Sequence, residues 1–83
     1  MDFIELLRVI RENPGMQLAT VDGDGQPHTR GMFMYAADAD GIVFHTGDFK
    51  RLYRELKTSP RVEMSFYDKN AFMQIRVRGE AVE

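Results

Sequence analysis

The chain has no cysteine among its 83 residues, so no disulfide can stabilise it. A chain of this length has room for one domain, since domains usually run from about 50 to 250 residues. We therefore expect a single domain over residues 1–83. Small domains bury a low fraction of their surface, which leaves a metal, a ligand or oligomerisation as the expected sources of further stability.

A strong charge of one sign is also lacking. The formal net charge is −2 and the isoelectric point is near 5.6, which provides no general cationic field for a nucleic acid. Asp2 and Glu5 stand where a signal peptide would carry positive charge, and no apolar run approaches the ~20 residues needed to span a bilayer. We expect a cytoplasmic protein that associates with neither nucleic acid nor membrane.

The motifs of hydrolases and metalloenzymes are missing as well. The sequence contains neither HExxH nor GxSxG, and its two histidines, His28 and His45, fall on different predicted strands. The run from Asp22 to Gln26 is similar to the start of a calcium loop, but an EF-hand also needs a later Glu and a helix on each side. A hairpin turn is the favoured interpretation of this run, and hydrolytic or metal catalysis is not expected.

What the chain does contain is the composition of a folded protein, with 43% hydrophobic and 29% charged residues. Apolar residues near the N-terminus recur at helical spacing and predict a short amphipathic helix that ends at Asn13-Pro14-Gly15. These residues are Phe3, Leu6, Leu7 and Ile10. Segments rich in β-branched, aromatic or alternating residues predict strands. They cover Met16–Val21, Gln26–Ala36, Ile42–Thr46, Arg61–Tyr67 and a last strand from Phe72 nearly to Glu83.

A second helix is predicted from about Asp48 to Lys57. Phe49, Leu52 and Leu56 share one helical face there with Tyr53, and Ser59-Pro60 ends the pattern. The predicted order is α-β-β-β-α-β-β, a mainly β (α+β) arrangement that favours a small barrel. Because the sequence offers no strand after Glu83 to cover the last edge, we expect the barrel to lack its C-terminal strands.

The start of this second helix has an unusual charge pattern. Lys50 and Arg51 occupy its first turn, where the helix dipole normally favours acidic residues. Thr46 offers a hydroxyl donor and Gly47 allows close backbone approach, so the segment from His45 to Arg51 outlines a phosphate pocket. The alternative is that both cations are solvated and partly neutralised by Asp48 as the N-cap. The spacing alone favours neither interpretation.

Five parts of the chain together carry a resemblance to a known family. They are Leu18-Ala19-Thr20-Val21-Asp22-Gly23-Asp24-Gly25-Gln26-Pro27, Arg30, Phe44-His45-Thr46-Gly47, Leu56-Lys57-Thr58-Ser59-Pro60-Arg61-Val62-Glu63 and Ile75-Arg76-Val77-Arg78-Gly79-Glu80-Ala81-Val82. From about Met16 onward the chain resembles the pyridoxamine 5'-phosphate oxidase-like FMN-binding split barrels. The general stress protein 26-like and nitroimidazole-reductase-like branches are the most similar.

The resemblance implies an FMN-binding flavoprotein, a homodimer with the cofactor at its interface, and a set of site residues. Arg30 would contact the phosphate or ribityl chain, and the backbone from Gly31 through Met32 to Phe33 would run beside the flavin ring. His45 would lie against the ring or ribityl chain, and Gln74 near the ring. Thr46, Lys50 and Arg51 would bind the phosphate. Arg30 and Gln74 have the alternative of being ordinary exposed strand residues.

The chain also departs from the family pattern. The oxidase members have a substrate-binding lysine on the second strand, where this chain has Met34-Tyr35. The resemblance therefore implies an FMN-dependent oxidoreductase of unknown substrate in which no side chain need act as acid or base. Two alternatives stay open. One is a non-catalytic split barrel that binds a deazaflavin, or haem through His28 or His45. The other is a fragment that dimerises without a cofactor.

Overall fold

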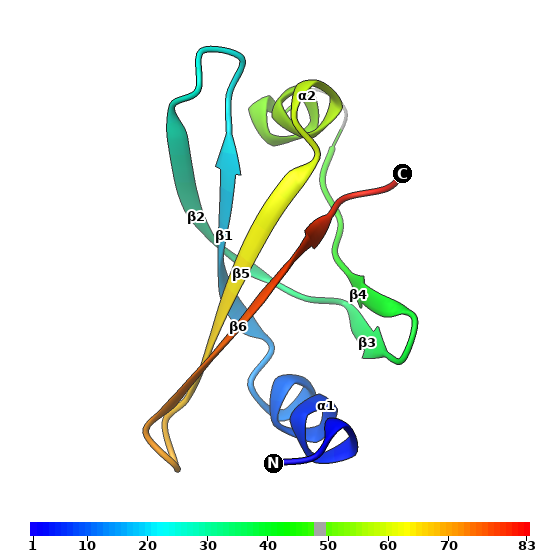
Figure 1. The fold of residues 1–83 in the computed structure, drawn as a ribbon, viewed down its shortest axis with the longest axis vertical. Coiled ribbons are helices and arrows are strands. Elements are labelled where there is room, and N and C mark those ends of the chain that lie inside the picture. The colour runs from blue at the N-terminus through cyan, green and yellow to red at the C-terminus, as the bar shows by residue number, and fades with distance from the viewer. Residues whose placement is uncertain (48–49) are drawn as a thin grey trace.

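The computed structural model describes residues 1–47 and 50–83 and contains two helices and six strands (Figure 1). In chain order these elements are α1 (Phe3–Glu12), β1 (Gly15–Val21), β2 (Pro27–Phe33), β3 (Ala36–Asp38), β4 (Gly41–Val43), α2 (Arg51–Thr58), β5 (Arg61–Asp68) and β6 (Met73–Glu80). The predicted mainly β class, with one helix at the N-terminus and one before the last two strands, is confirmed.

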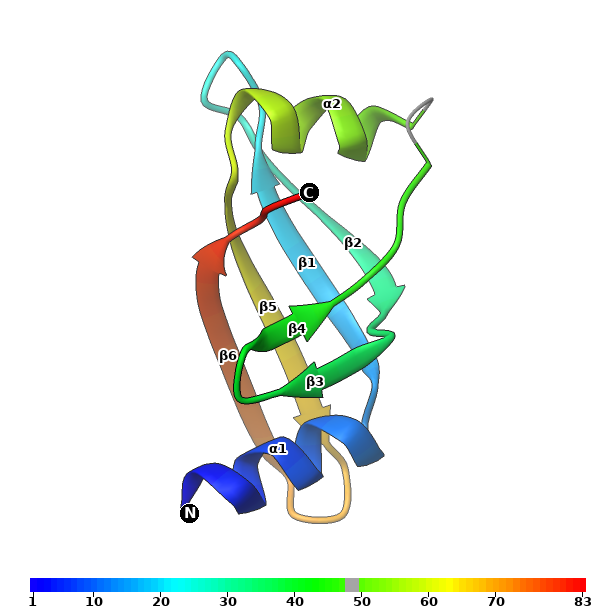
Figure 2. The same cartoon turned by 90° about the vertical axis from the view of Figure 1, so that its right-hand side faces the viewer.

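Four strands form one antiparallel sheet in the order β2-β1-β5-β6. The pair β3–β4 forms a second, separate sheet, so the strands do not close into a barrel within the described residues. Both helices and the β3–β4 pair lie on the same side of the large sheet, with α1 and α2 near its two ends (Figures 1 and 2). No helix or strand of the described residues covers the opposite face of this sheet, which we call the outer face (Figure 1).

The core lies between the covered face of the sheet and these three elements. Side chains of successive strand residues point to opposite faces, and the residues of β1 that face the core are buried whereas Gly15 and Gln17 are exposed. The buried apolar cluster consists of Val9, Ile10, Met16, Leu18, Ala37, Leu52, Met64, Phe66 and Ile75. The N-cap Asp2 accepts a hydrogen bond from the Glu5 backbone N–H at 2.8 Å, which fixes the start of α1.

The turn at Asp22 is a hairpin turn, as predicted. Its carboxylate accepts hydrogen bonds from the backbone N–H groups of Asp24 (2.9 Å) and Gln26 (3.0 Å), and Gly25 takes a positive φ of 86°. A side chain that bonds its own turn backbone in this way is typical of an Asx turn. The hairpin joins β1 to β2 and brings residues of both strands under α2.

The strand predicted over Gln26–Ala36 is two strands in the structure. At Met34 the backbone N–H still donates to the Pro14 carbonyl at 2.9 Å, but proline has no N–H to return a bond and the pairing with β1 ends. The Tyr35 N–H donates instead to Val43 at 2.7 Å, which directs the chain into the β3–β4 pair. The order is therefore α-β-β-β-β-α-β-β.

Three predicted element boundaries are wrong. The strand expected over Ile42–Thr46 ends at Val43. Phe72 lies in the turn before β6, with a positive φ of 52° and 81% exposure, so it does not begin a strand. The second helix begins at Arg51, and Lys50 is its N-cap with an extended backbone. The alternative N-cap, Asp48, and the predicted apolar-face residue Phe49 lie outside the described residues.

No helix in the described part of the chain combines the length and the apolar composition that crossing a membrane requires.

We expect Leu18→Ala to lower the free energy of unfolding by about 2–5 kcal/mol, because it leaves a cavity at the centre of the sheet. Leu18 is 0% exposed. The measurement is urea unfolding followed by circular dichroism. Ile4→Ala, at an exposed position of α1, is the control and should change the same free energy by less than ~0.5 kcal/mol. Equal effects of the two variants would contradict this placement of the core.

Candidate functional site

A buried carboxylate on α2 joins that helix to the large sheet. One oxygen of Glu55, Oε1, accepts a hydrogen bond from Thr20 Oγ1 on β1 and another from Arg30 Nη2 on β2, both at 2.8 Å. Arg30 Nη1 also donates to Thr20 Oγ1 at 3.1 Å, which closes a three-membered network. The second oxygen, Oε2, lies 3.2 Å from Arg51 Nε in the first turn of the same helix. Two guanidinium groups from different elements therefore converge on one carboxylate.

The ionised form of Glu55 is favoured in spite of its burial. Burial by itself raises the pKa of this carboxyl, but the hydrogen bond from Thr20 and the charge of Arg30 outweigh it and leave the pKa below its ordinary value. The carboxylate is thus a fixed negative charge. With two arginines and one glutamate, the trio carries a net positive charge.

His28 and Asp22 form a second pair beside this network. His28 Nε2 lies 2.9 Å from Asp22 Oδ2, 3.8 Å from Glu55 Oε2 and 3.5 Å from an Nη atom of Arg51. The hydrogen bond with His28, together with the backbone hydrogen bond from Gln26, lowers the pKa of Asp22 to about 2. The hairpin turn thus adds a second carboxylate whose ionised form is favoured.

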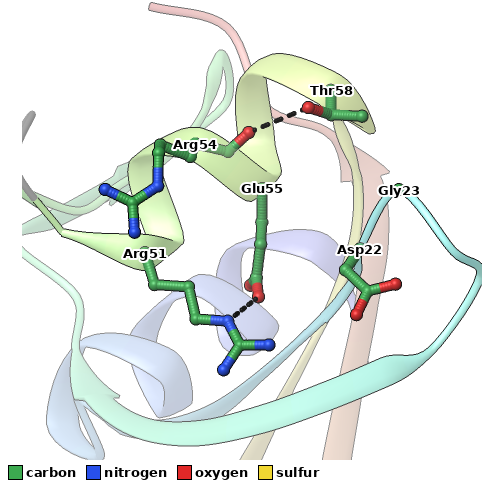
Figure 3. Close-up of a pocket in the computed structure, with 6 residues that line it drawn as sticks. All are labelled: Asp22, Gly23, Arg51, Arg54, Glu55 and Thr58. Atoms are coloured by element: carbon green, nitrogen blue, oxygen red, sulfur yellow. Dashed lines mark hydrogen bonds and ion pairs between the residues drawn. The ribbon is translucent and has the colours of Figure 1, made fainter.

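An open depression of about 430 Å³ lies between α2 and the β1–β2 turn. Figure 3 shows that Arg51 and Glu55 lie against one another in this depression, with Asp22 on the turn opposite them. Its lining residues are Asp22, Gly23, Arg51, Arg54, Glu55 and Thr58. The side chain of Arg51 is 66% exposed, so it can contact a ligand from solution.

The N-terminal end of α2 has the charge pattern expected of an anion site. The side chain of the N-cap residue, Lys50, makes no capping hydrogen bond, and the first turn of the helix from Arg51 holds no acidic residue. Ahead of the helix, Thr46 has a buried hydroxyl oxygen that finds no hydrogen-bond partner among residues 1–47 and 50–83. Buried hydroxyl groups are normally paired, and an unpaired one is evidence for a partner outside these described residues.

β2 forms one edge of the large sheet, and half of its backbone groups face away from β1. Hydrogen bonds from Met34 to Pro14 and from Asp22 to Gln26 flank the β1–β2 ladder, so the even-numbered residues of β2 bond to β1. The N–H and C=O groups of Gly31 and Phe33 therefore point out from the edge. The side chain of Met32 packs against the core, whereas that of Phe33 is exposed.

The remaining predicted site residues lie apart from the network. His45 is exposed and contacts Tyr35 edge to face, with ring centroids 4.8 Å apart. Gln74 donates to Ser65 Oγ at 2.7 Å on the outer face of β6. Because β6 and β2 are opposite edges of the sheet, Gln74 and Arg30 occupy opposite edges and opposite faces. The structure thus joins Arg30 with Arg51 and separates both from Gln74.

Sequence reasoning missed Glu55, Thr20 and Asp22 as members of this cluster and considered His28 only as a haem ligand. A signal for Glu55 does exist in the sequence. It follows Leu52 by three residues and precedes Leu56, so helical periodicity places it on the apolar face of the helix. A carboxylate on such a face needs a buried partner of opposite charge.

Comparisons with known proteins agree with this arrangement of sheet and helices. A solved structure named F420 reductase has a TM-score of 0.83 and 30% identity, and the match covers 100% of this chain and 64% of that one. A pyridoxamine 5'-phosphate oxidase-related, FMN binding protein from Nostoc punctiforme has a TM-score of 0.82 over 94% of this chain and 44% of its own. At 22% sequence identity, this likeness shows a shared fold alone.

The sequence matches are more specific. A family model described as pyridoxamine 5'-phosphate oxidase matches residues 4–83. The pyridoxine/pyridoxamine 5'-phosphate oxidase of Rhodopseudomonas palustris (strain HaA2) is 42% identical over 64 residues, which is 77% of this chain and 30% of the relative. The class is therefore that of the split-barrel proteins, and the chain belongs to the pyridoxamine 5'-phosphate oxidase family. It spans about a third of the length of the curated relatives it matches.

We expect the free energy of unfolding to fall less steeply with decreasing pH in Asp22→Asn than in wild type. The folded-state pKa of Asp22 is about 2 against an ordinary value of 3.8, so its contribution is fully present above the ordinary value and is lost as the pH falls through the folded value. The variant should therefore be less stable than wild type at neutral pH, and the difference should shrink as the pH falls toward 2. Urea unfolding at a series of pH values measures it.

Asp24→Asn in the same turn is the matched control, because its backbone, not its carboxylate, takes part in the Asp22 hydrogen bonds. A His28→Ala variant should reproduce the shallower pH dependence, since His28 is the largest cause of the lowered pKa. If the free energy of unfolding of Asp22→Asn fell between pH 4 and 2 as steeply as that of wild type, the Asp22 carboxylate would contribute nothing to stability.

Proposed function

We propose that this chain binds FMN and that the phosphate of FMN is bound by Arg30, Thr46, Lys50 and Arg51. The observation that carries the proposal is the convergence of Arg30 and Arg51 on Glu55, which brings two guanidinium groups to one carboxylate, with Arg51 in the first turn of α2. Arginine presents several donors in a fixed plane and suits a phosphate that accepts several hydrogen bonds.

Thr46 and Lys50 would complete the phosphate site. The buried hydroxyl of Thr46 needs a partner, and a phosphate oxygen is one that its sequence position before α2 favours. Lys50 places an exposed ammonium group at the N-cap, where it raises the positive potential of the helix end. A hydroxyl and an ammonium group are thus available, besides the two guanidinium groups, to donate hydrogen bonds to the doubly charged phosphate.

The flavin ring would lie along the free edge of β2. The outward backbone groups of Gly31 and Phe33 can bond to the polar edge of a heterocycle, and glycine lets the ring approach the backbone closely. Met32 would support this edge from the core side. His45 would contact the ring or the ribityl chain from the segment after β4. These residues fit the cofactor that the family resemblance implies.

When FMN is bound, the cofactor supplies hydride or electron transfer, and the protein supplies binding, orientation and electrostatics. In this proposal the chain is an FMN-dependent oxidoreductase. Its arginines and backbone N–H groups bind and orient the cofactor, and the exposed Tyr35–His45 pair borders the space open to a substrate. None of these side chains has to transfer a proton for the flavin to react.

The site would be shared between two copies of the chain. Gln74 lies on the opposite face and the opposite edge of the sheet from Arg30, so one planar ligand cannot reach both residues of a single copy across the packed core. A homodimer in which Gln74 of the second copy meets the ring resolves this separation. The uncovered outer face, which carries Gln74, is available for such an interface (Figure 1).

A deazaflavin is the second candidate ligand. It is favoured by the 30% identity and the TM-score of 0.83 to the protein named F420 reductase. A terminal phosphate monoester is the feature of FMN that the proposed cluster would select. Competition between the two ligands for one site therefore distinguishes the candidates.

We expect Arg51→Ala to weaken FMN binding by roughly ten- to a hundredfold, because it removes a charge-assisted bond to the phosphate. Thr46→Val should act in the same direction and more weakly, since it removes a neutral donor. Quenching of flavin fluorescence on titration of the protein measures the Kd. Riboflavin, which has no phosphate, should bind wild type and both variants equally.

Arg8→Ala is the matched control for charge. Arg8 lies on α1, at the other end of the sheet from α2 (Figure 2), and its exposed side chain pairs with Glu12 at 3.0 Å. FMN should bind this variant with wild-type affinity. The proposal is wrong if wild-type protein does not bind FMN, or if Arg8→Ala weakens binding as much as Arg51→Ala does.

A mixing experiment tests the shared site. If each site takes Arg30 from one copy and Gln74 from the other, Arg30→Ala and Gln74→Ala proteins should each bind FMN weakly, whereas their mixed dimers regain one intact site. High-affinity sites should therefore return when the two variants are unfolded together and refolded. No recovery, with both proteins dimeric by analytical ultracentrifugation, would place both residues in one copy's site or Gln74 outside it.

A further inference from the structure

Glu55 holds its two arginines unequally. Arg30 is held at two points, by Oε1 of Glu55 at 2.8 Å and by the Thr20 hydroxyl at 3.1 Å, and its side chain is 26% exposed. Of the two Glu55 oxygens, Arg51 meets only Oε2, through Nε at 3.2 Å, and its Nη2 lies 3.5 Å from His28 Nε2; its side chain is far more exposed. Arg30 therefore belongs to a closed network that spans α2, β1 and β2, whereas Arg51 has one ion pair within its own helix and one long contact to β2.

The two oxygens of Glu55 differ in the same way. Oε1 accepts the bonds from Thr20 and Arg30, while Oε2 is buried and has no well-formed hydrogen bond within the described residues. The Oε2 contact with Arg51 is therefore an ion pair without good hydrogen-bond geometry. If Arg51 turned toward a ligand, Glu55 would keep both of its strong bonds, and His28 Nε2 would remain 3.8 Å from Oε2.

We propose that Glu55 is a positioning residue for the phosphate site: through Thr20 and Oε1 it keeps Arg30 in one orientation, and through Oε2 it releases Arg51 to the incoming phosphate. This inference rests on the proposed function, since it concerns the same FMN site. It assigns the two arginines different roles, a fixed donor and an exchangeable one. Fixing a long side chain before binding reduces the conformational entropy lost when the ligand arrives.

The proposal predicts an effect of the opposite sign to simple charge repulsion. A carboxylate beside a phosphate binding site repels the phosphate, so on Coulombic grounds alone its neutralisation should tighten FMN binding. If Glu55 instead orients Arg30, neutralisation should weaken binding, because Arg30 then samples orientations that do not meet the phosphate. The sign of the change in Kd therefore decides between the two.

The experiment compares FMN and riboflavin binding by wild type and by Glu55→Gln in the 83-residue chain, using flavin fluorescence. We expect the variant to bind FMN roughly tenfold more weakly, since the ion pair with Arg30 becomes a weaker hydrogen bond to an uncharged amide. Riboflavin affinity should not change, because the effect acts through the phosphate. Equal or tighter binding of FMN overturns the proposal, and so does an equal loss for both ligands, which would indicate a purely structural role.

Thr20 provides a second variant that keeps the carboxylate. Thr20→Val removes the hydroxyl that bonds both Glu55 and Arg30 and should weaken FMN binding in the same phosphate-specific way, whereas Thr20→Ser should restore it. The control Glu12→Gln, at an exposed position of α1 at the other end of the sheet from α2, should leave both affinities unchanged. Wild-type FMN affinity in Thr20→Val would overturn the proposal even if Glu55→Gln failed to fold. Failure of wild type to bind FMN would instead overturn the proposed function.

Discussion

Burying the charge of Glu55 requires donors from more than one element, and this requirement determines how α2 lies on the sheet. Removing a carboxylate from water costs several kcal/mol even after the surroundings relax. Here Thr20 and Arg30 offset the cost from β1 and β2, and Arg51 contributes from the helix itself. Leu52 adds apolar burial beside it. The buried residues of this eight-residue helix are Leu52 and Glu55, so directional hydrogen bonds fix its position on the sheet as well as hydrophobic contact.

Most of the fold could be predicted from local patterns. The spacing of Leu6, Leu7 and Ile10 was enough for α1, and Asp22 with Gly25 was enough for the first hairpin, because both depend on residues close in sequence. The break after Met34 could not be predicted in this way. It results from the missing N–H of Pro14, a residue twenty positions earlier, and no local signal at Met34-Tyr35 marks it. Phe72 was misplaced for a related reason, since an aromatic residue favours a strand and the turn geometry overrides that preference.

The residues of the candidate site likewise differ in whether local sequence could predict them. Thr46, Lys50 and Arg51 were indicated by helix-end electrostatics, which act over a few residues. Arg30 could be singled out only through the family resemblance. The Thr20–Glu55 bond joins residues 35 positions apart, so its existence depends on the tertiary structure. The sequence carried only a general indication of it, namely a charged residue on the apolar face of a helix.

The two edges of the large sheet differ in a way that affects how the protein behaves at high concentration. On β6, the residues with outward backbone groups include Arg76, Arg78 and Glu80, whose charges oppose pairing with another strand. On β2 the corresponding residues are Thr29, Gly31 and Phe33, which carry no charge. Unwanted strand addition, the first step of many aggregation processes, is therefore directed to β2. A molecule bound along that edge would act as a solubility factor as well as a ligand.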